Sequence, residues 1–212
     1  MCQPSYREDR LLVHHALIRA YPLGTLITRG PTGLEGNPIP FVLDEKAGGA
    51  GVLRAHIARA NRHWCDFDPQ SEALVVFMGP QTYVSPSWSL PKQAGARIGP
   101  TWNYACAHAY GSMRIVEDRG WLLRQIRDLT EFEERDRPTP WSIDEAPPEF
   151  IEAMLDQIVG LEIAIDRIEG KWKVSQAREE AGRQGIIGSL AARGAIGDRA
   201  MAELIAAADA GK

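Results

Sequence analysis

Cysteine is scarce in this chain of 212 residues, and none of the common metal or nucleophile motifs is present. The three cysteines, Cys2, Cys65 and Cys106, are odd in number and widely spaced, which argues against a disulfide framework and a zinc knuckle. The sequence also lacks the zinc motif H-E-x-x-H, the elbow G-x-S-x-G, the dinucleotide motif G-x-G-x-x-G and the P-loop. We therefore predict no metal site, and the motifs assign no catalytic residue.

Excess positive charge and long apolar runs are missing as well. Lys and Arg total 24 against 28 Asp and Glu, for a formal net charge of −4. That balance does not favour binding to DNA, RNA or anionic membranes. No apolar run approaches the roughly 20 residues of a membrane helix, and the first ten residues, MCQPSYREDR, are polar and charged. We therefore expect a cytoplasmic protein without membrane association.

The residues that are present predict one α+β fold, mainly β. Hydrophobic residues make up 44% of the chain, which is enough for an ordinary core. Short extended stretches with turns every eight to twelve residues favour an antiparallel barrel or sandwich. The predicted strands cover residues 23–28, 37–43, 52–57, 72–78, 101–116 and 159–168, and the predicted helices cover residues 7–20, 58–67, 121–132 and 148–158. We expect a barrel domain with peripheral helices at residues 1–176 and a helical tail at residues 177–212.

The first segment with chemical potential runs from Arg54 to Asn61 at a predicted passage from strand to helix. Arg54 and His56 alternate onto one face of the strand, and Arg59 and Asn61 fall where free backbone N–H groups begin a helix. Two arginines at such a position could cradle a phosphate. A surface cluster of ion pairs explains the same residues, and the pattern alone does not separate the two hypotheses.

Three further segments combine aromatic and hydrogen-bonding residues. Residues 79–88, with Tyr83, Ser85 and Ser87, suit either a planar heterocycle or an aromatic turn that packs on the barrel. Trp102 shares strand parity with other aromatic residues that line either the core or a pocket, and Asn103 follows it. Residues 170–176 read by themselves as a solvated basic turn.

Six segments in the same order resemble the PaiB family, described as FMN-binding negative transcriptional regulators. They span nearly the whole chain: AYPLGTLIT, GVLRAHIARAN, VVFMGPQTYVSPSW, PTWNYACAHAYG, DEAPPEFIEAMLDQIVGLEI and GKWKVSQ. The resemblance implies a split β-barrel similar to pyridoxamine 5'-phosphate oxidase-like proteins, with flanking helices. It also implies a homodimer with FMN at the subunit interface.

The resemblance further implies which residues bind FMN. The segment from Arg54 to Asn61 resembles the phosphate-binding part of the site, and the segment with Tyr83, Ser85 and Ser87 resembles the part near the isoalloxazine or the ribityl chain. The remaining two segments match the third and the last motif of the family. The implied cofactor-binding residues are Arg54, His56, Arg59, Asn61, Tyr83, Ser85, Ser87, Trp102, Asn103, Lys171, Trp172, Ser175 and Gln176.

Two classes of function follow. The family description implies a repressor of transcription, whereas relatives of the fold include oxidoreductases that pass hydride from NAD(P)H through the flavin. A flavin- or haem-binding module without turnover is a third alternative. DNA is a partner by the family description only, because neither the net charge nor a recognisable helix-turn-helix supports it.

Overall fold

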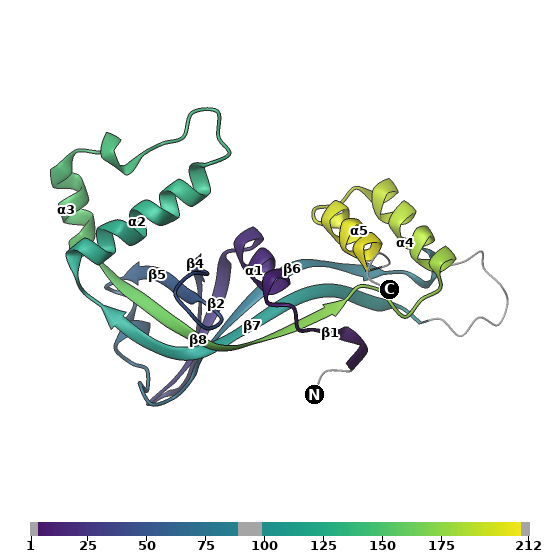
Figure 1. Ribbon diagram of the computed structural model, residues 1–212, viewed down its shortest axis with the longest axis horizontal. Helices are drawn as coiled ribbons and strands as arrows, with labels where there is room; N and C mark the ends of the chain where they lie inside the picture. Colours follow the sequence, from purple (N-terminus) through teal and green to yellow (C-terminus); the bar gives the residue numbers. More distant parts are fainter. Residues whose placement is uncertain (1–3, 89–98, 209–212) are drawn as a thin grey trace. The chain divides into compact units, whose positions relative to one another are not determined.

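The computed structural model describes residues 4–88 and 99–208 (Figure 1). Within these ranges the strands are β1 (Arg7–Glu8), β2 (Leu23–Gly30), β3 (Gly33–Pro40), β4 (Val42–Asp44), β5 (Val52–Ala58), β6 (Ala73–Val84), β7 (Thr101–Val116) and β8 (Ile158–Lys173). The α-helices are α1 (Leu11–Ala20), α2 (Arg119–Glu134), α3 (Pro148–Asp156), α4 (Glu180–Arg193) and α5 (Asp198–Ala207). Short 3-10 helices lie at η1 (Pro4–Tyr6), η2 (Arg62–Trp64), η3 (Pro86–Trp88) and η4 (Ile143–Glu145).

The sheet follows the order β3-β2-β6-β7-β8-β5-β4, and β1 pairs with β8. The pairs β2 with β3, β2 with β6, β4 with β5 and β5 with β8 are all antiparallel. The predicted α+β class, mainly β, is confirmed. No helix in the described part of the chain has both the length and the apolar character that crossing a membrane requires.

The chain forms two compact units, and β6, β7 and β8 each contribute residues to both. The first unit comprises residues 1–10, 78–107 and 169–212, and the second comprises residues 11–77 and 108–168. The division of the chain into a barrel domain and a tail after residue 176 stays a prediction. Residues 209–212 of that tail lie outside the described part of the chain.

The second unit has a core of alternating strand residues. Leu26, Leu53 and Leu161 are fully buried, and the rings of Phe41 and Phe77 meet edge to face with centroids 5.8 Å apart. Side chains alternate between the faces of a strand, so the period-2 pattern of these segments leaves one face for the core. The helices α2 and α3 add a smaller apolar cluster in the same unit, formed by Leu122, Ile126, Ile143, Ile151 and Leu155.

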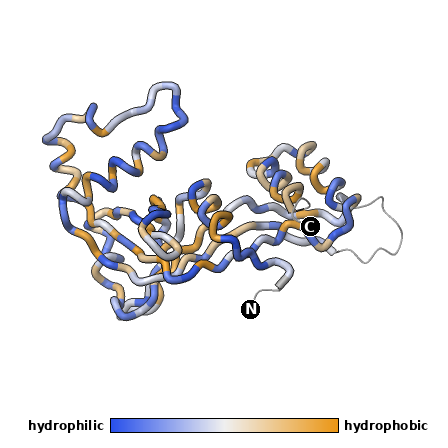
Figure 2. The backbone as a smooth tube through the Cα atoms, viewed as in Figure 1, coloured by the Kyte–Doolittle hydropathy of each residue, from blue (hydrophilic) through white to orange (hydrophobic). Residues whose placement is uncertain are grey.

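The first unit has its own core, built where α4 and α5 pack on strand residues. Figure 1 shows the two helices side by side, and Figure 2 shows orange and blue stretches alternating along both, as expected for amphipathic helices. Their apolar face buries Ile186, Leu190, Met201 and Ile205 against Val84 and Val174.

Several predicted boundaries were wrong. The predicted helix at residues 7–20 begins only at Leu11, because Arg7–Glu8 pairs with β8 instead. The predicted helix at residues 58–67 is reduced to the 3-10 turn Arg62–Trp64. Gly79-Pro80 does not end the strand as expected, since β6 continues to Val84. The first and third errors arise because pairing with other strands overrides local helix and turn signals. At residues 58–67, Ala58 is still paired within β5 and Asn61 caps only the short turn.

Candidate functional site

The segment from Arg54 to Asn61 lies in the second unit, and Arg54 is part of an ion-pair network there. The Nη1 atom of Arg54 lies 2.9 Å from Oδ2 of Asp44, and its Nε donates to Glu162 across the strand pair at 3.1 Å. Arg114 also pairs with Glu162. Burial raises the pKa of Glu162, but the hydrogen bonds from Arg114 and Arg54 outweigh burial and hold the pKa below its usual value.

Arg59 lies at the C-terminal end of α3 and bonds to three acceptors. Its Nη1 donates to Glu117 at 2.8 Å, and Nε and Nη2 donate to the backbone carbonyls of Asp156 and Ile158, both at 3.2 Å. A guanidinium near the last carbonyls of a helix complements the helix dipole. The sequence prediction placed Arg59 and Asn61 in the first turn of a helix. Instead, Asn61 caps η2, where its side-chain oxygen accepts from the backbone N–H of His63 at 3.0 Å.

His56 is covered by α2. Its Nδ1 lies 2.5 Å from Oε1 of Gln125, a side chain that is only 2% exposed. Burial lowers the pKa of His56, and the hydrogen bond with Gln125 opposes that effect. The Nε2 atom of Gln125 is buried without a hydrogen-bond partner among the described residues. The segment that the sequence proposed for phosphate binding is therefore held by carboxylates, carbonyls and an amide, and its role in phosphate binding stays a prediction.

The other three predicted segments lie in the first unit and touch one another. Tyr83 on β6 and Trp102 on β7 are 43% and 50% exposed, and their rings meet edge to face with centroids 6.2 Å apart. The indole N–H of Trp102 donates to Gln81 at 3.2 Å. On the same strand as Trp102, the ring of Tyr104 lies 5.2 Å from Nζ of Lys171. Two exposed rings, Tyr83 and Trp102, therefore lie near a partly buried pair of Tyr104 and Lys171.

Two hydroxyl groups follow Tyr83 closely in the sequence. Ser85 comes after Val84 and Ser87 after Pro86, and their Oγ atoms are 2.8 Å apart at the start of η3. Both serines are at least partly accessible, and Ser87 is exposed. A hydroxyl pair that bonds to itself in this way can exchange that bond for one to a ligand at small cost.

The third and fourth segments are joined by a buried pair. Asn103 is fully buried, and its Nδ2 donates to Oγ of Ser175 at 2.9 Å. Ser175 has φ of +61°, the left-handed region that residues other than glycine rarely adopt. Gln176 closes the turn by accepting from the backbone N–H of Val174 and donating to the carbonyl of Trp172. Residues 170–176 are therefore more than the solvated basic turn that their composition alone predicted.

The donor set of the first unit fits a flavin nucleotide. An isoalloxazine is a planar heterocycle, for which exposed aromatic side chains with adjacent polar groups are suitable partners. Tyr83 and Trp102 would contact such a ring, and Ser85 and Ser87 would bond to a polyol or a phosphate. The arginines of the second unit already donate to carboxylates, Arg54 to Glu162 and Arg59 to Glu117.

Sequence reasoning missed the residues that hold these segments in place. Gln125 contacts His56, while Arg193 and Asp198 contact Thr82 beside Tyr83. The partners are separated by 69 and 111 residues in the sequence, and no local spacing joins them. Only helix amphipathicity hinted that these helices pack on the strands.

The same fold occurs in a solved flavoprotein. The structure of the flavocytochrome Anf3 from Azotobacter vinelandii matches with a TM-score of 0.55 at 12% identity, over 81% of this chain and 72% of that chain. The fold is a split barrel of the flavin-binding class, as the sequence resemblance implied.

Residues 1–167 match the family model described as "Putative FMN-binding domain", and the chain belongs to this family. FMN is accordingly its cofactor. The protease synthase and sporulation protein PAI 2 of Bacillus subtilis is 31% identical over 72% of this chain and 71% of its own length. Protein AN0679 of Emericella nidulans is 32% identical over 94% of both chains. The resemblance to the PaiB family is thereby confirmed.

Proposed function

We propose that this protein is an FMN-dependent negative regulator of transcription of the PaiB type, located in the cytoplasm. The observation that carries the flavin part is the exposed pair of rings, Tyr83 and Trp102, beside the hydroxyls of Ser85 and Ser87. The regulatory part rests on the resemblance to the PaiB family, described as negative transcriptional regulators, to which the similarity with the protease synthase and sporulation protein PAI 2 adds support.

The proposal includes a homodimer with FMN at the subunit interface. Tyr83 and Trp102 expose about half of their surface on adjacent strands, and large exposed aromatic side chains are typical of surfaces that bind a partner or a ligand. A second subunit laid over this surface would shield both the rings and the flavin from water. Sedimentation equilibrium with and without FMN measures the oligomeric state. A monomer under both conditions would contradict the proposed dimer.

The regulatory activity does not require that the chain bind DNA by itself. The helices α4 and α5 are joined by a short turn at residues 194–197, which is the connectivity of a helix-turn-helix. However, α5 carries Asp198, Arg199 and Glu203, and both of its carboxylates already accept from arginines. A recognition helix needs cations that reach the phosphates, so α5 is unsuited to that role. We infer that repression acts through another macromolecule.

Two measurements test the proposal. The visible spectrum of the purified protein and a titration with FMN establish flavin binding and its stoichiometry, which we expect to be one FMN per chain. A gel-shift titration at low salt then tests the DNA part, where we expect no retardation of promoter DNA at about 1 µM dimer. Absence of flavin binding would refute the proposal, and sequence-specific retardation would refute the inference on DNA.

A flavin-dependent oxidoreductase is the second candidate. The specific observation in its favour is the same exposed aromatic pair, because a flavin bound there has a face that a nicotinamide can approach before a partner covers it. Steady oxidation of NADH or NADPH by the FMN-loaded protein, above the rate with free FMN, would favour this candidate over the regulator. No excess over free FMN would exclude it.

A further inference from the structure

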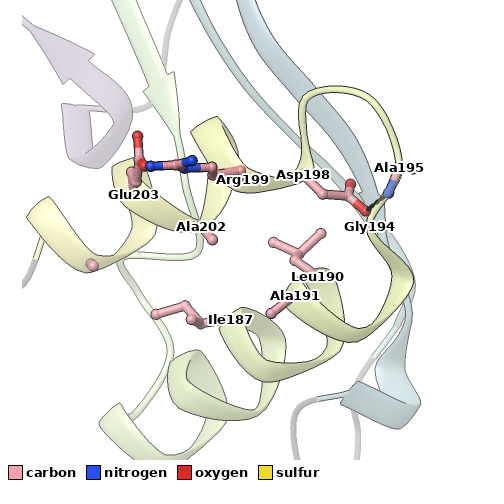
Figure 3. Close-up of a pocket in the computed structure, with 10 residues that line it drawn as sticks. Ile187, Leu190, Ala191, Gly194, Ala195, Asp198, Arg199, Ala202 and Glu203 are labelled. Atoms are coloured by element: carbon pink, nitrogen blue, oxygen red, sulfur yellow. Dashed lines mark hydrogen bonds and ion pairs between the residues drawn. The ribbon is translucent and has the colours of Figure 1, made fainter.

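The turn between α4 and α5 is held to β6 by an ion pair in which the carboxylate of Asp198 is buried and the side chain of Arg193 is 37% exposed. Nε of Arg193 donates to Oδ2 of Asp198 at 2.8 Å, and Nη2 of Arg193 donates both to Oδ1 of Asp198 and to Oγ1 of Thr82. Asp198 is 2% exposed and also accepts from the backbone N–H of Ala195 at 2.9 Å, the contact drawn in Figure 3. Every oxygen of this carboxylate therefore has a partner.

The contact with Arg193 extends to the end of the same segment. Its guanidinium carbon lies 5.1 Å from the ring centroid of Trp88, in η3. Arg193 thus touches both Thr82 and Trp88, the residues on either side of Tyr83, Ser85 and Ser87. A single side chain of the tail holds the two ends of the stretch that carries three proposed flavin contacts.

The apolar contacts of the two helices fall on the same stretch. Val84 and Val174 are buried against Ile186, Leu190 and neighbouring side chains of α4 and α5. Because strand side chains alternate, Thr82 and Val84 face the helices while Tyr83 points to the opposite face. The helices therefore pack on the buried side of β6, whose exposed side carries Tyr83, a proposed flavin contact.

We propose that the pair Arg193–Asp198 positions the flavin-binding surface of the first unit, so that the helices α4 and α5 are a working part of the FMN site. This inference rests on the proposed function. Asp198 and Arg193 are positioning residues: they touch Thr82 and Trp88 and act on FMN only through the strand. The matched part of the FMN-binding family ends at residue 167, so family membership does not assign this role.

The variant Asp198→Asn tests the proposal, with Glu203→Gln as its matched control. Both replace a carboxylate of α5 by its amide, but Glu203 is exposed and forms an ion pair with Arg199 on the same helix. Figure 3 shows these two carboxylates at separate places along the groove between the helices. We expect Asp198→Asn to weaken FMN binding about tenfold, under conditions where thermal unfolding shows it fully folded, because a displaced binding group loses most of its contact. Glu203→Gln should bind within about twofold of the unmodified protein.

Hydrogen exchange supplies a readout that does not depend on FMN. In Asp198→Asn the amides of residues 82–88 should exchange about tenfold faster than in Glu203→Gln, with the amides of the second unit unchanged. Equal FMN affinity and equal exchange in the two variants would overturn the positioning role. Failure of the unmodified protein to bind FMN would instead refute the proposed function, and the exchange data would still decide the positioning role.

Should Asp198→Asn not fold, Thr82→Val and Thr82→Ser decide the question. The valine keeps the shape of the side chain but removes the hydroxyl that accepts from Arg193, whereas serine retains it. We expect about a threefold loss of FMN affinity with valine and recovery with serine. Affinity unchanged by valine would overturn the proposal.

Discussion

Replacing Arg59 by alanine separates the two hypotheses for the segment from Arg54 to Asn61. If Arg59 binds the phosphate of FMN, its loss removes at least one charge-assisted hydrogen bond to an anion. If Arg59 only bonds to Glu117 and to backbone carbonyls near the end of α3, its loss lowers the stability of the fold and leaves the affinity for FMN unchanged. In a binding assay the first hypothesis therefore predicts a loss of FMN affinity and the second predicts no change.

The two magnitudes differ enough to be told apart. A hydrogen bond to a charged group contributes about 1.5–3 kcal/mol, which corresponds to a loss of FMN affinity of about 10- to 100-fold. The existing contacts of Arg59 are worth less. Its side chain is 39% exposed, and screened ion pairs of this kind contribute about 0–1 kcal/mol to folding. We therefore expect a small loss of stability with a large loss of FMN affinity.

Quenching of flavin fluorescence measures the binding of FMN and of riboflavin, which lacks the phosphate. Arg59→Ala should lower the affinity for FMN and leave the affinity for riboflavin unchanged. Arg62→Ala is the matched control, because Arg62 is exposed and forms a local ion pair with Asp66, four residues on. The phosphate hypothesis is refuted by an unchanged FMN affinity in Arg59→Ala, or by an equal loss for both ligands.

Three further predictions concern stability. Asn103→Ala leaves the buried hydroxyl of Ser175 without its partner and should lower the free energy of unfolding by about 2–3 kcal/mol in urea titrations. Gly111→Ala places a Cβ 1.8 Å from the backbone oxygen of Ala164, so a loss of about 3 kcal/mol is expected by the same measurement, and an unchanged midpoint would contradict it. Burial lowers the pKa of His63 in spite of a nearby carboxylate, so below about pH 6.5 the unfolded chain binds a proton that the folded chain refuses. Stability should therefore fall between pH 7.5 and 5.5, and His63→Gln should reduce the slope of unfolding free energy against pH.

Much of the fold could be predicted from the strand and helix patterns of the sequence. β7 spans Thr101–Val116, as predicted. Its aromatic, alanine and apolar residues alternate with a period of two, and this pattern can be read from the sequence alone. The helix at Arg119–Glu134 lies close to its prediction for a similar reason, since its apolar stripe repeats every three to four residues. The family was predicted from six characteristic segments that occur in the same order as in the PaiB family. No single motif was sufficient for this prediction.

Contacts between distant segments decided what local patterns could not. Gly79-Pro80 resembles a strand end, yet β6 continues through it because its neighbours in the sheet supply the hydrogen bonds. Likewise, composition presents Arg54 and His56 as open groups on a strand face. The structure pairs Arg54 with Glu162, 108 residues away, and covers His56 with Gln125.

The sequence by itself determined the class of the protein: a mainly β fold with FMN as its cofactor and four segments of polar and aromatic residues. Only the tertiary structure decided that three of these segments lie together in the first unit. It also decided that Arg193 and Asp198 contact Thr82, next to Tyr83 on β6. The physical reason is that alternation and helical periodicity depend on neighbours in the chain. An ion pair or a buried hydrogen bond depends instead on which distant side chains the folded backbone brings within about 3 Å.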